Sequence, residues 1–355
     1  MFLVVINSDH HGECKTRELM IVETIAVILV SLLLVVYYYG RVPKPLHASE
    51  TERPNPRPDA TPETLRAMIE QFEEKLPIMP GLRTELVLDD NCKQEKADVC
   101  IVYVHGWKAG HKECEPLLES LSRELNSTTH VLKLRLSGHG GIPGNGQAER
   151  LSSASLENLK SDILWAHKTA THVAKKVFVI GHSMGGALST WCACEQKIDG
   201  LVLIAPCFGL NDDTFIHLKF GSWPSVLRRS VLRAKGYKYG KAENEAHAKY
   251  WVMNYPHVAS ELVIQVVNLV QSCNLSCIEC PVLCFQHCDD QTALFSATKT
   301  AIDQIGNAKL FTDCEGDALD HHVICGDIFA PGQTKKIVDR ISTFLNPSNK
   351  EQRSR

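Results

Sequence analysis

The sequence has little net charge and no run of basic residues. Its 355 residues include 38 lysines and arginines against 41 aspartates and glutamates, which leaves a formal net charge of −3. Domains that bind nucleic acid neutralise its phosphates with clustered positive charge. The composition therefore argues against nucleic acid as a partner.

Glycine and proline are too few for a collagen-like or low-complexity chain, at 22 and 16 residues. Hydrophobic residues make up 44% and charged residues 22%, which are ordinary values for a globular protein. At roughly 150 residues per domain, the length allows one large domain with added segments, or two domains.

Cysteine is plentiful by comparison, with 14 residues. The chain is nevertheless far too long for a small domain held together by disulfides. Five cysteines gather in one segment, but their spacing matches no common zinc framework: Cys273, Cys277, Cys280, Cys284 and Cys288. We expect these thiols to be buried or in loops, and we expect no metal and no cofactor.

Charge is nearly absent from one N-terminal stretch. Leu19–Tyr39 holds 21 residues and a single charge, Glu23. A helix of that length spans about 31 Å, close to the hydrocarbon thickness of a bilayer. The stretch ends in three tyrosines and is followed by Arg41, which suits a membrane–water boundary. We therefore expect a transmembrane helix over 20–40 after a tail of residues 1–19. A buried core helix or a signal peptide is the alternative.

Positive charge on the two sides of this stretch predicts its orientation. Basic residues are fewer before it than after it: Lys15 and Arg17 against Arg41, Lys44, Arg53 and Arg57. Because cytoplasmic flanks carry the excess of lysine and arginine, the domain that follows is expected on the cytoplasmic side. A lumenal or periplasmic domain is the alternative.

Residues 41–60 contain five prolines and alternating charges, which predicts a stiff, solvated linker. Thr61 then caps a helix with Pro62 at its first position. The globular domain is expected over 61–346, followed by a C-terminal tail at 347–355.

Apolar runs rich in β-branched residues alternate with helical patterns through this domain. The runs lie at 85–88, 99–104, 131–136, 177–180, 201–204, 282–285 and 309–311. Continuous apolar strands separated by helices predict an α/β fold whose mostly parallel sheet is covered on both faces. The interval 207–276 is too long for one crossover, so we expect a cap there, above the strand ends.

The strongest motif is Gly181-His182-Ser183-Met184-Gly185, which matches G-x-S-x-G. A strand precedes it and a helix follows it, as the turn that presents a nucleophilic serine requires. Ser183 is therefore the predicted nucleophile. The backbone N–H of Met184 is a predicted oxyanion donor, and His182 is expected to support the turn.

A second motif, His105-Gly106-Trp107, stands at the end of another apolar strand. Such a loop can present the N–H of Trp107 to an oxyanion. An ordinary glycine turn is the alternative.

Two pairs of neighbouring residues could supply the acid and the base. Asp289 and Asp290 follow the strand at 282–285, where an acid can orient an imidazole. His321 and His322 follow the last strand. The order serine, aspartate, histidine is one of the known chain orders of a catalytic triad.

From about residue 80 to 346, the chain resembles the α/β-hydrolase superfamily. It is most similar to the monoacylglycerol lipase/lysophospholipase branch and to bacterial carboxylesterases. The matching pieces are VHGW (104–107), LSGHGG (136–141), GHSMGG (181–186), CDDQT (288–292) and HHVI (321–324). The set is specific for the superfamily and not for a substrate.

The resemblance implies that Asp290 is the acid and His322 the base. Two histidines depart from the family pattern, since His287 and His321 stand where glycine is usual. The G-H-G loop of this branch shapes the mouth of the site, so His139 is expected beside the substrate, together with His105 and Gly106.

Apolar residues in the expected cap predict an acyl pocket. They are Phe208, Phe215, Ile216, Phe220, Trp223, Val226 and Leu227. Phe220 and Trp223 are the predicted acyl-chain contacts. The alternative is a cap whose apolar side only packs on the body.

Together these features predict a membrane-anchored serine hydrolase that cleaves carboxylic esters through an acyl-enzyme. Its partners would be a small acyl ester, such as a monoacylglycerol or lysophospholipid, and the lipid bilayer. An aminopeptidase, thioesterase or lactonase on the same fold is an alternative, as is a non-catalytic domain that binds a partner.

Overall fold

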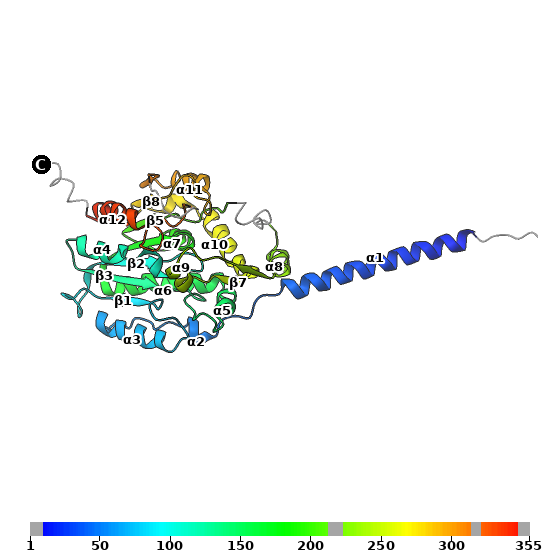
Figure 1. Cartoon of the computed structure of the whole chain (residues 1–355), viewed down its shortest axis with the longest axis horizontal. Helices are drawn as coiled ribbons and strands as arrows, with labels where there is room; N and C mark the ends of the chain where they lie inside the picture. The colour runs from blue at the N-terminus through cyan, green and yellow to red at the C-terminus, as the bar shows by residue number, and fades with distance from the viewer. Residues whose placement is uncertain (1–9, 212–222, 314–320, 347–355) are drawn as a thin grey trace, which may run out of the picture.

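The computed structural model describes residues 10–211, 223–313 and 321–346. A domain of alternating strands and helices occupies one end, and one long helix projects from it (Figure 1). That helix, α1, covers His10–Gly40.

A single large sheet forms the centre of the domain. Its strands are β1 (Glu85–Val87), β2 (Ala97–Val104), β3 (Thr129–Leu134), β4 (Ala174–His182), β5 (Gly200–Ile204), β8 (Val282–Phe285) and β9 (Ala308–Phe311). They lie in the order β1-β3-β2-β4-β5-β8-β9. β1 pairs antiparallel with β3, and the other neighbours pair in parallel. These seven strands match the seven apolar runs of the sequence, and the predicted α/β fold is confirmed.

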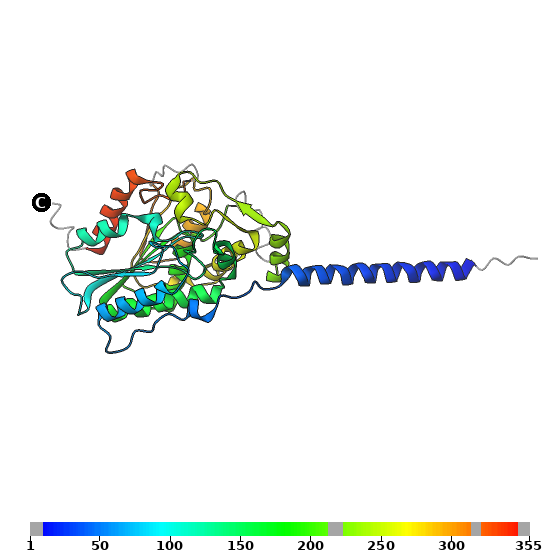
Figure 2. The ribbon, with the colours of Figure 1, turned by 60° about the horizontal axis from the view of Figure 1, so that its bottom comes forward.

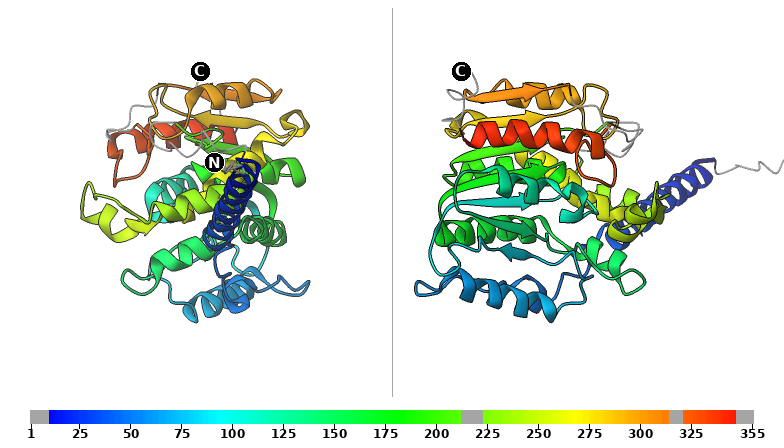
Figure 3. Two further views of the ribbon diagram at one scale, coloured as in Figure 1. Left: turned by 90° about the vertical axis from the view of Figure 1, so that its right-hand side faces the viewer. Right: turned by 60° about the vertical axis from the view of Figure 1, so that its left-hand side comes forward.

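Helices cover both faces of this sheet (Figure 3). Apolar residues of β2 alternate between the faces, with Val99, Ile101 and Tyr103 on one side and Cys100, Val102 and Val104 on the other. The first side packs on α4 (Leu117–Glu124) and α12 (Pro331–Leu345). The second packs on α3 (Pro62–Glu74), α6 (Leu156–Val173), α7 (Met184–Glu195), α10 (Glu261–Gln271) and α11 (Phe295–Ile302).

Shorter elements join these layers. They are α2 (Ala48–Thr51), α5 (Gln147–Ser153) and the 3₁₀ turns His111–Cys114, His257–Ser260 and Leu275–Cys277. Thr61 caps α3 by accepting a hydrogen bond from the N–H of Thr64 at 3.2 Å, as the sequence predicts.

The interval between β5 and β8 divides into two parts. Its first part holds α8 (Ser225–Ala234), the β6–β7 hairpin (Tyr237–Tyr239 and Asn254–Pro256) and α9 (Glu245–Tyr250), which we call the cap. The second part is α10, which lies in the main core through residues such as Val266, 0% exposed. The cap is therefore shorter than the predicted 207–276, because the apolar face of α10 covers the sheet.

Helix α1 is apolar over Met20–Gly40, a span long enough to cross a membrane by length and composition, and it is exposed over most of that length. The helix begins at His10, so part of the predicted 1–19 tail is helical.

The end of α1 lies against α8 of the cap (Figures 1 and 2). Arg229 Nε donates to the carbonyl of Gly40 at 2.7 Å, and Arg233 Nη1 donates to the carbonyl of Tyr39 at 2.7 Å. Ser230 Oγ lies 3.1 Å from the carbonyl oxygen of Val36 and 2.8 Å from that of Val226 in its own helix, so its one hydrogen is shared between them. The last carbonyls of a helix have no partner within it, so these side chains complete the C-terminal end of α1.

The segment 41–60 is not a solvated linker throughout, contrary to the prediction. Arg53 and Ala60 are both 8% exposed, and the carbonyl of Pro54 accepts a hydrogen bond from Trp165 Nε1 at 2.8 Å. The composition of the segment could not show this, because the carboxylates that bind Arg53 come from distant helices.

Candidate active site

Ser183 stands on a tight turn between β4 and α7. Its φ is +51°, a conformation that non-glycine residues adopt rarely and at a cost in energy. The turn has no room for a side chain at Gly181, where an added Cβ would lie 2.6 Å from the carbonyl oxygen of Gly185. The glycine of the motif is thus required by the close approach of the helix to the strand.

Three of the predicted residues meet at the carboxyl edge of the sheet. Ser183 Oγ lies 2.8 Å from His322 Nε2. The other ring nitrogen, Nδ1, lies 2.9 Å from Asp290 Oδ2. All three side chains are buried, because each residue is at most 7% exposed. The chain therefore has the geometry of a serine–histidine–aspartate triad.

The loop after β8 distinguishes the two aspartates. Asp290 Oδ1 accepts hydrogen bonds from the N–H groups of Thr292 and Ala293, both at 2.8 Å. Gln286 Nε2 donates to its Oδ2 at 3.1 Å. Asp289 is exposed, and its N–H donates to His287 Nδ1 at 3.0 Å. Only Asp290 reaches the histidine, and its remaining lone pairs are occupied, which fixes the carboxylate.

The loop after β9 likewise distinguishes the two histidines. His321 has a φ of +52°, which explains why glycine suits this position. Its ring stacks on His287, with centroids 4.2 Å apart. The two departures from the family pattern are therefore in contact with each other, and they leave His322 in place beside Ser183.

The predicted oxyanion donors border the same site. Trp107 follows β2, and Met184 is the first residue of α7, where the dipole of a helix favours negative charge. Gly106 lies so close that an added Cβ would stand 3.2 Å from Ser183 Cβ. The two loops that would form the oxyanion hole thus meet at Ser183.

Glu113 is a site residue that the sequence did not reveal. Its Oε1 accepts hydrogen bonds from Gly106 N–H at 2.7 Å and from the hydroxyl of Tyr103 at 2.8 Å. Its Oε2 lies 3.1 Å from Nδ1 of His182. Burial would raise the pKa of Glu113, but the nearby His182, His105 and Gly106 N–H outweigh it and keep this pKa below its usual value. Glu113 therefore links the oxyanion loop to the turn that carries Ser183.

His105 and His139 lie beneath the site and do not line its cavity. Both are 0% exposed, and burial lowers the pKa of His105 to about 3 and that of His139 to about 4. Nε2 of the neutral His105 accepts a hydrogen bond from Leu136 N–H at 3.0 Å. The ring of His139 packs edge-on against Trp107, with centroids 5.4 Å apart. Their contacts are with the protein, contrary to the substrate-binding prediction.

A cavity of about 310 Å³ opens above Ser183 and His322. Gly106 and Trp107 line it, together with cap residues, and its apolar walls include Leu210, Trp251, Tyr255, Val263 and Phe329. Trp223 precedes α8, is 41% exposed and lies outside this lining, so the apolar walls of the cavity are formed by residues other than the predicted Trp223. Phe215, Ile216 and Phe220 lie outside the described residues.

Side chains of the types that can bind metals form one group of three in the part of the chain that the structure describes. Ligand atoms of His287, Cys288 and Asp289 lie within 4.8 Å of one another, and Cys288 and Asp289 are exposed. The cysteines among the described residues form no disulfide.

The chain is similar in sequence and in fold to known proteins. The chain is 29% identical over 142 residues to protein phosphatase methylesterase 1 of Schizosaccharomyces pombe, across 38% of this chain. The chain spans only 40% of the length of that curated relative.

Solved structures with the same fold include lipolytic enzymes. One belongs to a study of the metagenome-derived enzymes LipS and LipT; it has a TM-score of 0.59 and 18% identity, and covers 76% of this chain and 99% of its own. Another is a soluble variant of monoglyceride lipase from Saccharomyces cerevisiae, with a TM-score of 0.54, 14% identity, and coverage of 75% and 91%. A family model described as the alpha/beta hydrolase family matches residues 101–324, more than half of the sequence. The chain therefore belongs to the alpha/beta hydrolase family.

Proposed function

We propose that the protein is a membrane-anchored serine hydrolase that cleaves carboxylic esters of acyl chains, such as monoacylglycerols or lysophospholipids. The observation that carries the proposal is the line of hydrogen bonds from Ser183 Oγ through His322 to Asp290, at 2.8 and 2.9 Å. This arrangement activates a serine hydroxyl for attack on a carbonyl carbon.

In the proposed reaction, Ser183 Oγ attacks the ester carbonyl while its proton passes to His322 Nε2. Asp290 holds the Nδ1–H of the ring and stabilises the imidazolium that forms. The N–H groups of Trp107 and Met184 stabilise the oxyanion of the tetrahedral intermediate. His322 then returns the proton to the departing alcohol, leaving an acyl-Ser183. Water attacks this ester with His322 as base, and the carboxylic acid is released.

Two features support an acyl ester as substrate. The cavity above Ser183 has apolar and aromatic walls, including Trp107, Val263 and Phe329, which suit a hydrocarbon chain. A structure with the same fold is the yeast monoglyceride lipase, although its 14% identity establishes only the fold.

The membrane anchor is supported by the exposed apolar surface of α1. Most of its side chains between Met20 and Val35 are exposed, and the ribbon of this part of the helix projects away from the domain (Figure 1). Basic side chains gather at the domain end of the helix: Arg41 from the chain itself and Arg229 and Arg233 from the cap. Arg53 is buried and does not add to the positive charge beside the membrane, but Arg229 and Arg233 of the cap do. The balance supports a domain on the cytoplasmic side.

A fluorophosphonate probe tests the nucleophile. The purified full chain in detergent should be labelled, and Ser183→Ala should abolish labelling and lower ester hydrolysis by a factor on the order of 10⁶. Unchanged turnover in that variant would reject Ser183 as the nucleophile. Absence of both labelling and turnover in the wild type would favour a non-catalytic domain.

A series of p-nitrophenyl esters tests the substrate class. Each methylene buried in the cavity contributes about 0.8 kcal/mol, so kcat/KM should rise roughly fourfold per carbon from acetate until the cavity is full. Val263→Phe, which narrows the cavity, should stop the rise at a shorter chain. Rates must be measured below micelle formation.

A carboxyl methylesterase is the second candidate, favoured by the 29% identity to protein phosphatase methylesterase 1. Such an enzyme needs room for a methoxy leaving group and for the end of a peptide on the acyl side, and not for a hydrocarbon chain. A profile that is flat from acetate to octanoate, with hydrolysis of peptide C-terminal methyl esters, would support it over the acyl esterase.

A further inference from the structure

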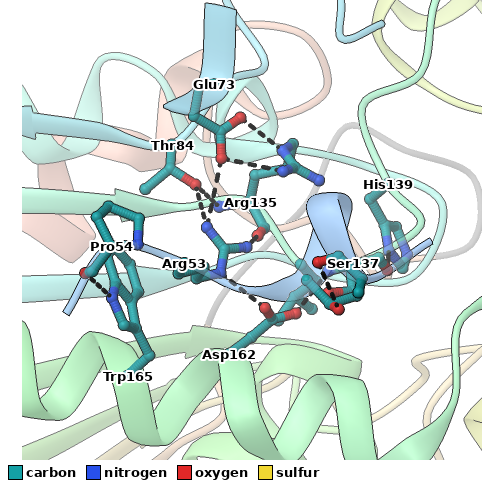
Figure 4. A network of polar contacts seen from close by, with 12 residues as sticks. Arg53, Pro54, Glu73, Thr84, Arg135, Ser137, His139, Asp162 and Trp165 are labelled. Atoms are coloured by element: carbon teal, nitrogen blue, oxygen red, sulfur yellow. Dashed lines mark hydrogen bonds and ion pairs between the residues drawn. The ribbon is translucent and has the colours of Figure 1, made fainter. Parts of the chain in front are cut away.

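Arg53 is the only residue of the segment 41–60 whose charged side chain enters the core of the domain among the residues described. Its Nε donates to Asp162 Oδ1 at 2.8 Å, and Nη1 donates to Glu73 Oε1 at 3.3 Å and Thr84 Oγ1 at 3.0 Å (Figure 4). Nη2 donates to the carbonyl of Arg135 at 2.5 Å. The guanidinium thus joins α3, α6 and the end of β3.

The chain directly after β3, residues 135–137, is held by a buried side chain at each of its three positions. The carbonyl of Arg135, the first of the three, accepts a hydrogen bond from Arg53 Nη2. The N–H of the second donates to Nε2 of His105 at 3.0 Å. The N–H of the third donates to Asp162 Oδ2 at 2.6 Å. Arg53 therefore contacts this segment twice, once directly and once through Asp162.

The same segment fixes the loop that would form the oxyanion hole. His105 is bound at Nε2 by residue 136, and its Nδ1 lies 2.8 Å from the carbonyl of Gly106. Because Nε2 accepts a hydrogen bond, the hydrogen of the neutral ring is on Nδ1, which donates it to the carbonyl of Gly106. A shift of residues 135–137 would move His105, and with it Gly106 and the adjoining Trp107.

Charge makes Arg53 hard to replace. Asp162 and Glu73 have side chains 2% and 0% exposed. Glu73 would keep Arg135, which binds it from Nε at 2.8 Å and Nη2 at 3.0 Å. Asp162 forms its ion pair with Arg53 and with no other cation among the described residues. Loss of Arg53 would leave Asp162 as a buried charge without its counter-ion, next to the segment that it holds.

We infer that Arg53 is a positioning residue for the oxyanion loop, so that the chain next to the membrane helix supports the active site. Its catalytic consequence rests on the proposed hydrolase function. The structural part, that Arg53 orders residues 135–137, stands without it. The ring of Trp165 lies under the guanidinium at 4.9 Å from Cζ, which holds Arg53 in this geometry.

Steady-state kinetics of full-length variants in detergent test the catalytic part. Arg53→Ala should lower kcat about 10- to 100-fold, the effect of a displacement near 1 Å. KM should change less than kcat, because no cavity residue is substituted and the oxyanion N–H groups act mainly on the transition state. Arg53→Lys should retain more activity than Arg53→Ala, because it keeps the charge beside Asp162. Methylguanidinium should restore part of the kcat of Arg53→Ala and none in the wild type. Arg57→Gln, an exposed arginine of the same segment, is the matched control.

Hydrogen exchange tests the structural part without any reaction. Amides of residues 134–141 should exchange faster in Arg53→Ala and Arg53→Lys, by a larger factor than the other amides of the sheet, whose exchange reports the stability of the whole domain. Unchanged exchange there, or equally faster exchange throughout the domain with no rescue by methylguanidinium, would overturn the inference. If the wild type hydrolyses no ester, the proposed function fails, and the exchange result still decides whether Arg53 orders this segment.

Discussion

Acid should destabilise this fold through the two histidines beneath the oxyanion loop. Burial lowers the pKa of His105 to about 3 and that of His139 to about 4. An unfolded histidine has a pKa of about 6.5, so between pH 6.5 and 4 the unfolded chain binds more protons than the folded one. The free energy of unfolding is therefore largest above pH 6.5 and falls as the pH is lowered toward 4.

At a pH between the folded and the unfolded pKa of a histidine, the size of this effect is set by the difference between the unfolded pKa and that pH. At pH 5 the unfolded histidine is protonated and His139 in the fold is neutral. A difference of about 1.5 pH units at about 1.36 kcal/mol per unit gives about 2 kcal/mol for each histidine. His139→Gln should thus reduce the loss of stability between pH 7 and pH 5 by about 2 kcal/mol. The variant will be less stable than the wild type at pH 7, because its ring contacts with Trp107 are lost.

Urea unfolding of the full chain in one detergent, at pH 7 and pH 5, measures this difference. Carboxylates titrate in the wild type and the variant alike, so their contribution cancels between the two proteins. Equal losses for His139→Gln and wild type would refute a neutral, buried His139.

Three further predictions concern the site and the anchor. Glu113→Gln should lower kcat at least tenfold with a smaller change in KM, since an amide cannot serve Gly106 N–H and His182 as the carboxylate does; steady-state kinetics would show it, and an unchanged kcat would contradict it. Asp290→Asn should reduce kcat on the order of 10⁴-fold, and Asp289→Asn should have little effect. A larger loss of kcat in Asp289→Asn would mean that Asp289, and not Asp290, is the acid of the triad. A domain that lacks residues 1–46 should be more stable than one that lacks 1–58, by about 3–5 kcal/mol in urea unfolding. Only the longer deletion removes Arg53 and leaves the buried carboxylate of Asp162 without its ion pair. Equal free energies of unfolding would mean that this ion pair contributes nothing to stability.

Local patterns were enough to predict the strands and the elbow. The inner strands β2, β5 and β8 are buried on both faces, so their sequences are apolar at most successive positions and stand out from the helices. The elbow requires glycine at 181 and 185 for steric reasons, which makes the motif around Ser183 readable from a few residues. The roles of Ser183, Asp290 and His322 stay predictions until the variants are measured.

Glu113 and Arg53 could not be found in this way. Glu113 lies in a short 3₁₀ turn and Arg53 in an irregular segment, and charged residues in such places are usually solvated. Their burial depends on partners that lie far away in the sequence: His182 for Glu113, and Glu73 and Asp162 for Arg53. No local spacing records such a pairing. The same reason made the segment 41–60 look like a free linker.

The contact between α1 and α8 has a mechanical consequence. A domain that hangs from a membrane helix by one stretch of chain can swivel about that tether. Here the helix is fastened twice: by the chain that leaves Gly40, and by Arg229, Ser230 and Arg233 of the cap on its final turn. Gly40 allows this, because an added Cβ would collide with Val226. Two attachments restrict rotation of the domain about the helix, so the helix and the cap hold a fixed relative orientation. With α1 in a bilayer, the cap would be carried at a constant height and tilt above the lipid surface.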